Sequence, residues 1–173
     1  MLWPQSLYEL TKNFTTGISL FYSSSTGSIK RALDRLLAEG LIQVESVGGP
    51  RGRRTYAITE AGREEFHRWM LENNSSGDFE TSALARSYFL GLIPADDRVT
   101  VADRIRARIR AELTQLEQLA AHADSQEIPQ GLEDVAQYQL ATLSYGLASL
   151  RTAAEWAERH LPQASAPSDS AVG

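Results

Sequence analysis

The segment from Thr26 to Gly62 constrains the fold most, because its residue types fix the order of its elements. Apolar residues that recur every three or four positions predict a helix over residues 25–39. A serine or threonine at the start can cap this helix, and Gly40 can end it in the left-handed conformation. A rigid helix with one apolar face is therefore expected to open the segment.

Two short strands are expected next. Residues 41–47 alternate loosely between apolar and polar, and residues 55–58 do the same. The stretch between them, from Gly48 to Arg54, holds three glycines and a proline, which predicts a hairpin tip rather than regular structure. Thr59 can then cap a further helix over residues 60–71.

Helices are expected on both sides of this segment. Residues 7–14 predict a short helix, whereas residues 15–22 are ambiguous because Gly17 interrupts them. The second half predicts only helices, over residues 80–92, 97–123 and 131–161. The predicted fold is mainly α with a small β-hairpin. It comprises a winged helix-turn-helix N-terminal domain and an all-α C-terminal dimerisation domain.

The composition predicts where these domains divide. Residues 73–78 are polar, contain Asn, Ser and Gly, and lack periodicity, so a linker is expected over 73–79. The expected domains are a winged helix over 1–72 and a helical domain over 80–161. The tail from 162 to 173 is rich in Ala, Ser and Pro and is expected to be disordered.

The last two helices carry apolar stripes suited to helix pairing. In the final helix the apolar residues alternate spacings of four and three without a break, the period of a coiled coil or an antiparallel helix pair. Pairing between two chains and pairing within one chain would both produce these stripes. The residues expected at a dimer interface are Ile105, Ile109, Leu113, Leu140, Leu143, Leu147 and Leu150.

The distribution of charge separates the two halves. The whole chain has a net charge of −5. Residues 73–173 carry most of the acidic excess, whereas residues 27–54 hold six basic and three acidic residues. A basic patch can hold phosphate whatever the sign of the whole protein.

This basic segment predicts a DNA-binding surface. Small residues at the start of the first helix permit close approach to a groove, and arginines on its outward face can reach base edges or phosphates. Arginines on a wing suit the minor groove or the backbone. The residues expected to contact double-stranded DNA are Thr26, Gly27, Ser28, Lys30, Arg31 and Arg35 on the helix, and Arg51, Arg53, Arg54 and Tyr56 on the wing.

Other functions lack a matching pattern. The chain contains no cysteine, which excludes disulfides, thiolate zinc sites and cysteine nucleophiles. Its three histidines are scattered, and no catalytic motif or cofactor fingerprint occurs, so we expect no catalytic residues, no metal site and no cofactor. No signal peptide and no membrane-length apolar run is found, so a cytoplasmic protein without membrane contact is expected.

The motifs around the wing resemble those of the PadR family of bacterial transcriptional regulators. The matching stretches are 36–42, which reads LLAEGLI, and 54–62, which reads RTYAITEAG. Tyr8-Glu9-Leu10 resembles the motif that opens the second helix of the family, which implies that Tyr8 contacts DNA. The helical half is similar to the C-terminal domain of the AphA-like, virulence-activator branch, through residues 143–147 and 155–156.

The resemblance implies a homodimer that represses or activates at an inverted repeat. In some members of the family a small hydrophobic or phenolic effector relieves the repression. The sequence departs from the family at Lys30, where the family usually has tyrosine, and at its start, because only seven residues precede Tyr8. The first helix of the winged domain is thus expected to be missing or shortened through truncation, a misassigned start codon or genuine loss. Apolar surface would then need cover from the C-terminal domain or a partner.

Two functions compete on these observations. The first is a sequence-specific DNA-binding transcriptional regulator, a ligand-responsive repressor acting as a homodimer on an inverted-repeat operator. The alternative is a dimeric protein-interaction module that has lost DNA binding. An enzyme is not expected.

Overall fold

The computed structural model describes residues 3–20, 22, 24–48, 53–72 and 78–164. The chain divides into two compact units, Met1–Ile93 and Pro94–Gly173, each of which is described by itself. Most of the expected linker, residues 73–77, lies outside the described residues, and the helix that follows it belongs to the first unit in this division. Among the described residues, no helix is long and apolar enough to cross a bilayer.

The first unit begins with strand β1 (Gln5–Ser6) and helix α1 (Leu7–Thr16). The buried Ser6 caps the helix, and the Glu9 carboxylate accepts hydrogen bonds from both the backbone amide of Ser6, at 2.8 Å, and its hydroxyl, at 2.6 Å. These hydrogen bonds lower the pKa of Glu9 below its ordinary value of 4.5, and the one from the Ser6 hydroxyl has the largest effect. The reciprocal cap explains why the helix starts where the strand ends.

Helix α2 (Thr26–Ala38) follows a 3₁₀ turn, η1 (Ile18–Leu20). The Ser25 hydroxyl accepts a hydrogen bond from the Ser28 amide, and Gly40 leaves the helix at φ 69°. Both ends therefore match the sequence prediction, since a capping serine and a left-handed glycine are the expected signals.

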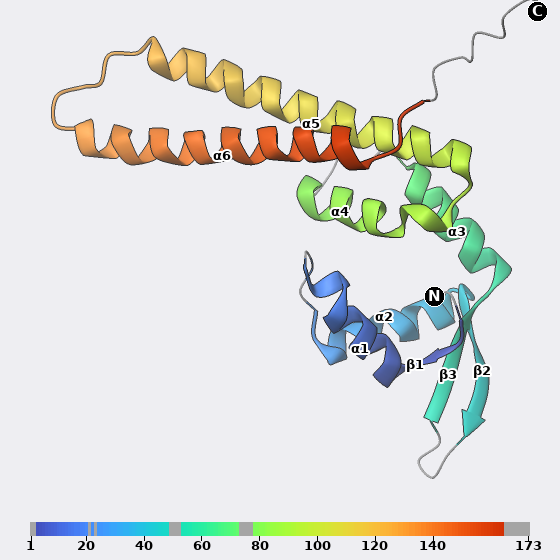
Figure 1. Cartoon of the computed structure of the whole chain (residues 1–173). Helices are drawn as coiled ribbons and strands as arrows, with labels where there is room; N and C mark the ends of the chain where they lie inside the picture. The colour runs from blue at the N-terminus through green and yellow to red at the C-terminus, as the bar shows by residue number, and fades with distance from the viewer. Residues whose placement is uncertain (1–2, 21, 23, 49–52, 73–77, 165–173) are drawn as a thin grey trace, which may run out of the picture. The chain divides into compact units, whose positions relative to one another are not determined.

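The sheet has three antiparallel strands in the order β1-β3-β2 (Figure 1). Strand β2 (Ile42–Gly48) and strand β3 (Arg53–Ile58) form the predicted hairpin, with Ile42 opposite Ile58 and a bulge between Val44 and Ser46. Strand β1 adds Gln5 opposite Tyr56. Strand β1 was not predicted, because its two polar residues show no alternation.

Helix α3 (Glu60–Leu71) is joined tightly to the end of α2. The Thr59 amide and hydroxyl donate to the carbonyls of Leu41 and Gly40, at 3.1 and 2.8 Å, and the hydroxyl also accepts from the Gly62 amide. A Cβ on Gly62 would collide with the carbonyl oxygen of Leu41. Glycine is thus required here so that the first turn of α3 can lie against the chain leaving α2.

Helix α4 (Phe79–Phe89) and a 3₁₀ turn, η2 (Leu90–Leu92), complete the first unit. Asp78 caps α4. Hydrogen bonds from Thr81 lower the pKa of Asp78, and the bond from the Thr81 hydroxyl has a larger effect than the bond from its amide. The buried Arg86 donates to the Trp69 carbonyl at 3.0 Å and lies 4.7 Å above the Trp69 ring, which ties α4 to the end of α3.

A cavity of about 1030 Å³ lies within the first unit, lined by α1, α2, α3 and α4. Its lining is largely apolar and includes Phe14, Ile29, Phe66 and Trp69. Helix α1 buries no residue completely and α2 buries only Leu33, since their apolar faces border this cavity.

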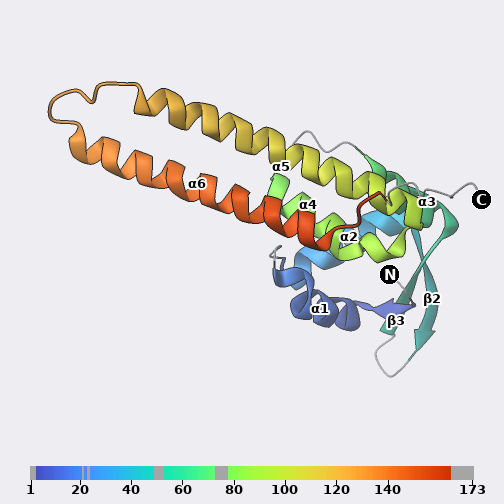
Figure 2. The same cartoon turned by 45° about the horizontal axis from the view of Figure 1, so that its top comes forward.

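The second unit is a hairpin of two long helices, α5 (Ala95–Asp124) and α6 (Glu133–His160), which run side by side in both views (Figures 1 and 2). Its buried residues gather where α5 begins and α6 ends, and none of the residues from 110 to 156 is buried. At this end the buried Arg106 donates to the carbonyls of Ala157 and Leu161, at 3.3 and 2.7 Å, and to Pro162. Arg106 thereby satisfies two carbonyls just beyond the end of α6, and it shares the Ala157 carbonyl with the amide of Leu161.

Candidate nucleic-acid interface

The outward face of α2 presents the residues expected at DNA. Thr26, Gly27, Lys30, Arg31 and Arg35 are exposed, and Ser28 is half-buried. Every residue expected on the recognition helix therefore lies on α2, and most are open to solvent.

A chain of hydrogen bonds holds Arg31 across the first turn of this helix. Its guanidinium donates to the Ser28 hydroxyl at 3.1 Å, and that hydroxyl is 3.1 Å from the Ser25 hydroxyl. A Cβ on Gly27 would lie 3.9 Å from the same guanidinium. The Arg31 charge is therefore held beside the small residues at the helix N-terminus, where a groove of DNA would approach.

The three cations of α2 are not equivalent. Arg35 forms an ion pair with Glu39 at 2.8 Å. Neither Lys30 nor Arg31 has a carboxylate within ion-pair distance in the part of the chain that the structure describes. Lys30 and Arg31 are thus the cations on this helix that can meet phosphate or a base without breaking an existing pair.

The wing differs from its prediction. Arg51 lies outside the described residues, whereas Arg53 and Arg54 belong to β3, opposite Gly48 and Val47, and not to a flexible turn. The strands extend this far because the proline and two of the three glycines fall at 49–52, which leaves residues 53 and 54 able to pair.

The strand geometry gives Arg53 and Arg54 different surroundings. Successive side chains on a strand point to opposite faces, so only one of the two can face a given surface. Arg53 is near enough to Glu9 to contribute, as the smallest of its causes, to the lowered pKa of that carboxyl. Both arginines are exposed.

Tyr56 and Tyr8 occupy unlike positions. Tyr56 lies in the middle strand, between Gln5 and Val44, and is half-buried. Tyr8 is 73% exposed on α1. Lys12, one turn further along α1, is also exposed and has no ion pair among the described residues. Lys12 was not among the predicted DNA contacts, although its spacing of four from Tyr8 places both residues on one helix face.

Most of the residues expected at a dimer interface already take part in packing within the chain. Ile105 and Ile109 are buried, and Leu143, Leu147 and Leu150 are half-buried on the face of α6 that meets α5. A Cβ on Gly146, on that same face, would lie 2.8 Å from Leu116 of α5. Leu113 is half-buried and Leu140 is 39% exposed. Their use in dimerisation stays a prediction.

No group of three or more metal-ligating side chains occurs among the residues that the structure describes. The described part of the first unit forms a helix with a basic outer face and a three-stranded sheet, two strands of which make the wing. Together with the helical second unit, they define the class of winged helix-turn-helix regulators with an all-α C-terminal domain.

Comparison with known proteins identifies the family. Residues 4–68 match the transcriptional regulator PadR-like family, and residues 82–163 match the virulence activator alpha C-terminal family. The chain belongs to the PadR-like family of transcriptional regulators and carries this C-terminal domain. No curated protein matches the chain.

Several solved structures are similar over most of their length. Bacillus subtilis PadR in complex with operator DNA is 20% identical, with 90% of this chain and 88% of that chain covered and a TM-score of 0.37. The PadR-like regulator BC1756 from Bacillus cereus is 24% identical, with 92% and 93% covered and a TM-score of 0.38. The Vibrio cholerae virulence activator AphA is 20% identical, with 91% and 88% covered and a TM-score of 0.35. These scores are low, and the family assignment rests on the two family models.

Proposed function

We propose that this protein is a sequence-specific DNA-binding repressor that acts as a homodimer on an inverted-repeat operator. The observation that carries the proposal is the face of α2, where Lys30 and Arg31 have no carboxylate partner among the described residues and Ser28 orients Arg31. Bacillus subtilis PadR, which is 20% identical to this chain, has been solved in complex with operator DNA.

A gel-shift titration against the DNA upstream of its own gene, over a series of salt concentrations, tests DNA binding. We expect the logarithm of the binding constant to fall steeply with the logarithm of salt concentration, by about 0.9 for each phosphate contact. A random duplex of equal length is the control for sequence preference. No binding even at low salt would instead favour the protein-interaction module.

A reporter gene placed behind the bound sequence tests the direction of regulation. A repressor lowers expression when the protein is supplied. Higher expression would contradict repression while leaving DNA binding intact.

We further propose that a small hydrophobic or phenolic effector binds in the cavity of the first unit. The volume of about 1030 Å³ and the largely apolar lining suit such a ligand, and Asn13 and Tyr88 supply polar groups at the wall. Bacillus subtilis PadR has been solved with p-coumaric acid, which makes this compound a suitable first probe.

Intrinsic fluorescence tests the effector site, because Trp3 and Trp69 line the cavity. We expect p-coumaric acid to change the emission of the wild type, and a Trp69→Phe variant to lose a large part of that change. A flat titration across a set of phenolic compounds would contradict the effector and leave the DNA-binding proposal untouched.

A further inference from the structure

The walls of the cavity in the first unit carry no positive charge. Among the described residues that line this cavity, the only charged side chain is Glu65, whose carboxylate forms an ion pair with Arg68. A ligand carboxylate that entered the cavity would lose its water without gaining a cation, which is strongly unfavourable. The lining therefore disfavours an anionic ligand.

The N-terminus of α2 does not take the place of a cation in this lining. Ser28 lines the cavity, but its backbone amide already donates to the Ser25 hydroxyl at 3.1 Å. Thr26 and Gly27, which begin the helix, are not among the lining residues. The amides that a helix N-terminus can offer to an anion are thus not presented to the cavity.

Two side-chain amides, those of Gln5 and Asn13, form a polar edge of the cavity, which we call the amide edge. Gln5 is only 6% exposed, and its carbonyl oxygen accepts a hydrogen bond from the Asn13 amide nitrogen at 3.3 Å. The Gln5 amide nitrogen and the Asn13 carbonyl oxygen have no further partner among the described residues. The amide edge therefore offers one donor and one acceptor close together.

The amide edge is complementary to an uncharged group that both accepts and donates. A buried donor without an acceptor is destabilising, so a ligand oxygen that accepts from Gln5 would remove this cost. An ionised carboxylate has no proton to donate, and its second oxygen would repel the Asn13 carbonyl. A primary carboxamide fits both groups, because its oxygen accepts from Gln5 and its N–H donates to Asn13.

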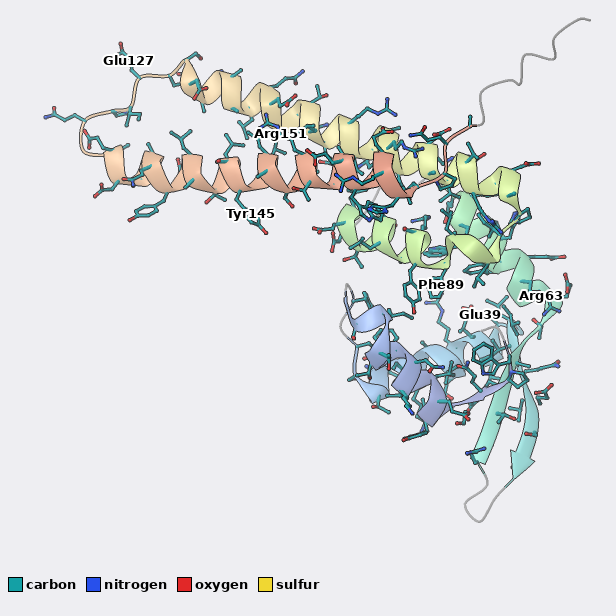
Figure 3. All side chains as sticks on the ribbon, in the orientation of Figure 1. Glu39, Arg63, Phe89, Glu127, Tyr145 and Arg151 are labelled. Carbon is teal, nitrogen blue, oxygen red and sulfur yellow. The ribbon has the colours of Figure 1, made fainter. Side chains whose placement is uncertain are left out.

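Aromatic rings supply much of the remaining wall. The rings of Phe14 and Tyr22 meet edge to face with their centroids 6.0 Å apart. Phe66 of α3 and Phe89 of α4 meet in the same way at 6.2 Å (Figure 3). A flat aromatic ligand can stack on such rings or meet their edges. The wall thus suits an aromatic body, and the amide edge suits its polar head.

We propose that the cavity selects uncharged aromatic ligands whose polar head both donates and accepts hydrogen bonds, as an arylamide does, and that it discriminates against carboxylates. The inference rests on the effector site in the proposed function and specifies the class of compound that this site takes. p-Coumaric acid is then a weak ligand of the cavity, held through its ring, and its amide is a tighter one.

Three compounds with the same aromatic body separate charge from hydrogen bonding. p-Coumaric acid is ionised at about pH 7.5, its methyl ester is uncharged but accepts only, and its primary amide is uncharged and both donates and accepts. Isothermal titration calorimetry on the full chain measures each dissociation constant. We expect the ester to bind about 10-fold more tightly than the acid, and the amide about 5-fold more tightly than the ester.

The order of the three affinities decides the proposal. An acid that binds as tightly as the ester, or an ester that binds as tightly as the amide, would overturn it while leaving an effector site in place. If none of the three compounds bound, the effector site of the proposed function would be contradicted together with this inference. None of these measurements uses DNA, so DNA binding is tested separately.

Removing the amide edge provides a second test. The double variant Gln5→Met/Asn13→Leu replaces both amides by apolar groups of similar size, which is expected to disturb the fold little because both partners of the hydrogen bond are lost together. We expect its amide and ester affinities to become equal. Thr15→Ala is the control, because Thr15 lies on the same helix outside the cavity lining and its hydroxyl donates to the Thr11 carbonyl.

Adding a cation at the amide edge should reverse the selectivity. Asn13 is exposed, so Asn13→Arg can be accommodated, and its guanidinium would pair with a ligand carboxylate. We expect the acid to bind this variant more tightly than the ester does. Circular dichroism shows whether each variant folds. A folded Asn13→Arg that keeps the order of the wild type would overturn the placement of the polar head at the amide edge.

Discussion

At the scale of single residues, Gly62 shows how one missing side chain positions the wing. Its position lets the first turn of α3 lie directly on the Leu41 carbonyl, while Thr59 bonds to the same stretch of backbone. The return from β3 is thereby fixed to the end of α2. The sequence motif ending at this glycine thus reflects a close contact between two backbones.

Gly62→Ala should lower the free energy of unfolding by about 3 kcal/mol or more, because a Cβ there must displace backbone and not a flexible side chain. Urea denaturation followed by circular dichroism measures the change. Gly48→Ala is the matched control, since nothing lies within 4 Å of a Cβ at that position. Equal stabilities for the two variants would contradict the contact.

Arg31 and Arg35 allow a second prediction, because they differ in their present partners. Arg31→Ala should weaken binding to the preferred operator by about 1–3 kcal/mol, with a smaller loss on random DNA, if its guanidinium contacts a base. Arg35→Ala should cost less, since Arg35 is already paired with Glu39. Gel shifts on both duplexes measure the two effects. A larger loss from Arg35→Ala would reverse the assignment.

At the scale of elements, the two strands of the wing pair as far as Arg53, so the side chains of Arg53 and Arg54 point to opposite faces. The two arginines should therefore contribute unequally to DNA binding. We expect Arg54→Ala to reduce the salt slope of DNA binding by about 0.9, the value of one phosphate contact. Arg53→Ala should change it little, because Arg53 lies toward Glu9. Equal reductions from both substitutions, measured by titration in several salt concentrations, would count against this geometry.

The cap of α1 predicts a dependence on pH. The folded-state pKa of Glu9 is depressed, so its contribution to stability is present above the ordinary value of 4.5 and is lost as pH falls through the lowered pKa. The difference in melting temperature between the wild type and Glu9→Gln should shrink between about pH 6 and about pH 3. A constant difference across this range would show that the Glu9 charge does not stabilise the cap.

The sequence predicted most elements because their signals are local. Helix α2, with its serine cap and left-handed glycine, and helix α3 lie where periodicity and capping residues place them. Strand β1 was missed because two residues carry no periodicity, and their strand geometry depends on pairing with β3. The ion pair of Arg35 with Glu39 was also missed, although its signal is local, because residues four apart on a helix are neighbours.

At the scale of the whole molecule, the apolar spacing of α5 and α6 was predicted, but its partner was not. The leucines of α6 could pack against a helix of the same chain or of a second chain, because a 3.5-residue period indicates only that another helix packs against them. In the structure, Gly146 faces Leu116 of α5, whereas Tyr138 and Tyr145 of α6 are exposed, so packing within the chain is shown and pairing between chains stays a prediction.

Dimerisation should also govern DNA binding. On a duplex with the complete inverted repeat, wild type should bind more tightly than on a single half-site, because one dimer engages both halves. Fluorescence anisotropy with both duplexes provides the measurement. A wild type that binds both duplexes equally would contradict a dimeric operator complex.

The distal part of the helical hairpin has a consequence for the speed of DNA recognition. Residues 111–150 contain six acidic residues and no lysine or arginine. The phosphates of DNA are repelled by this acidic surface and attracted by the cations of α2. A duplex that approaches the acidic surface is therefore expected to dissociate without binding. These charges therefore favour collisions in which the duplex approaches α2. The association rate constant should fall as salt rises, because screening weakens both the attraction and this preference.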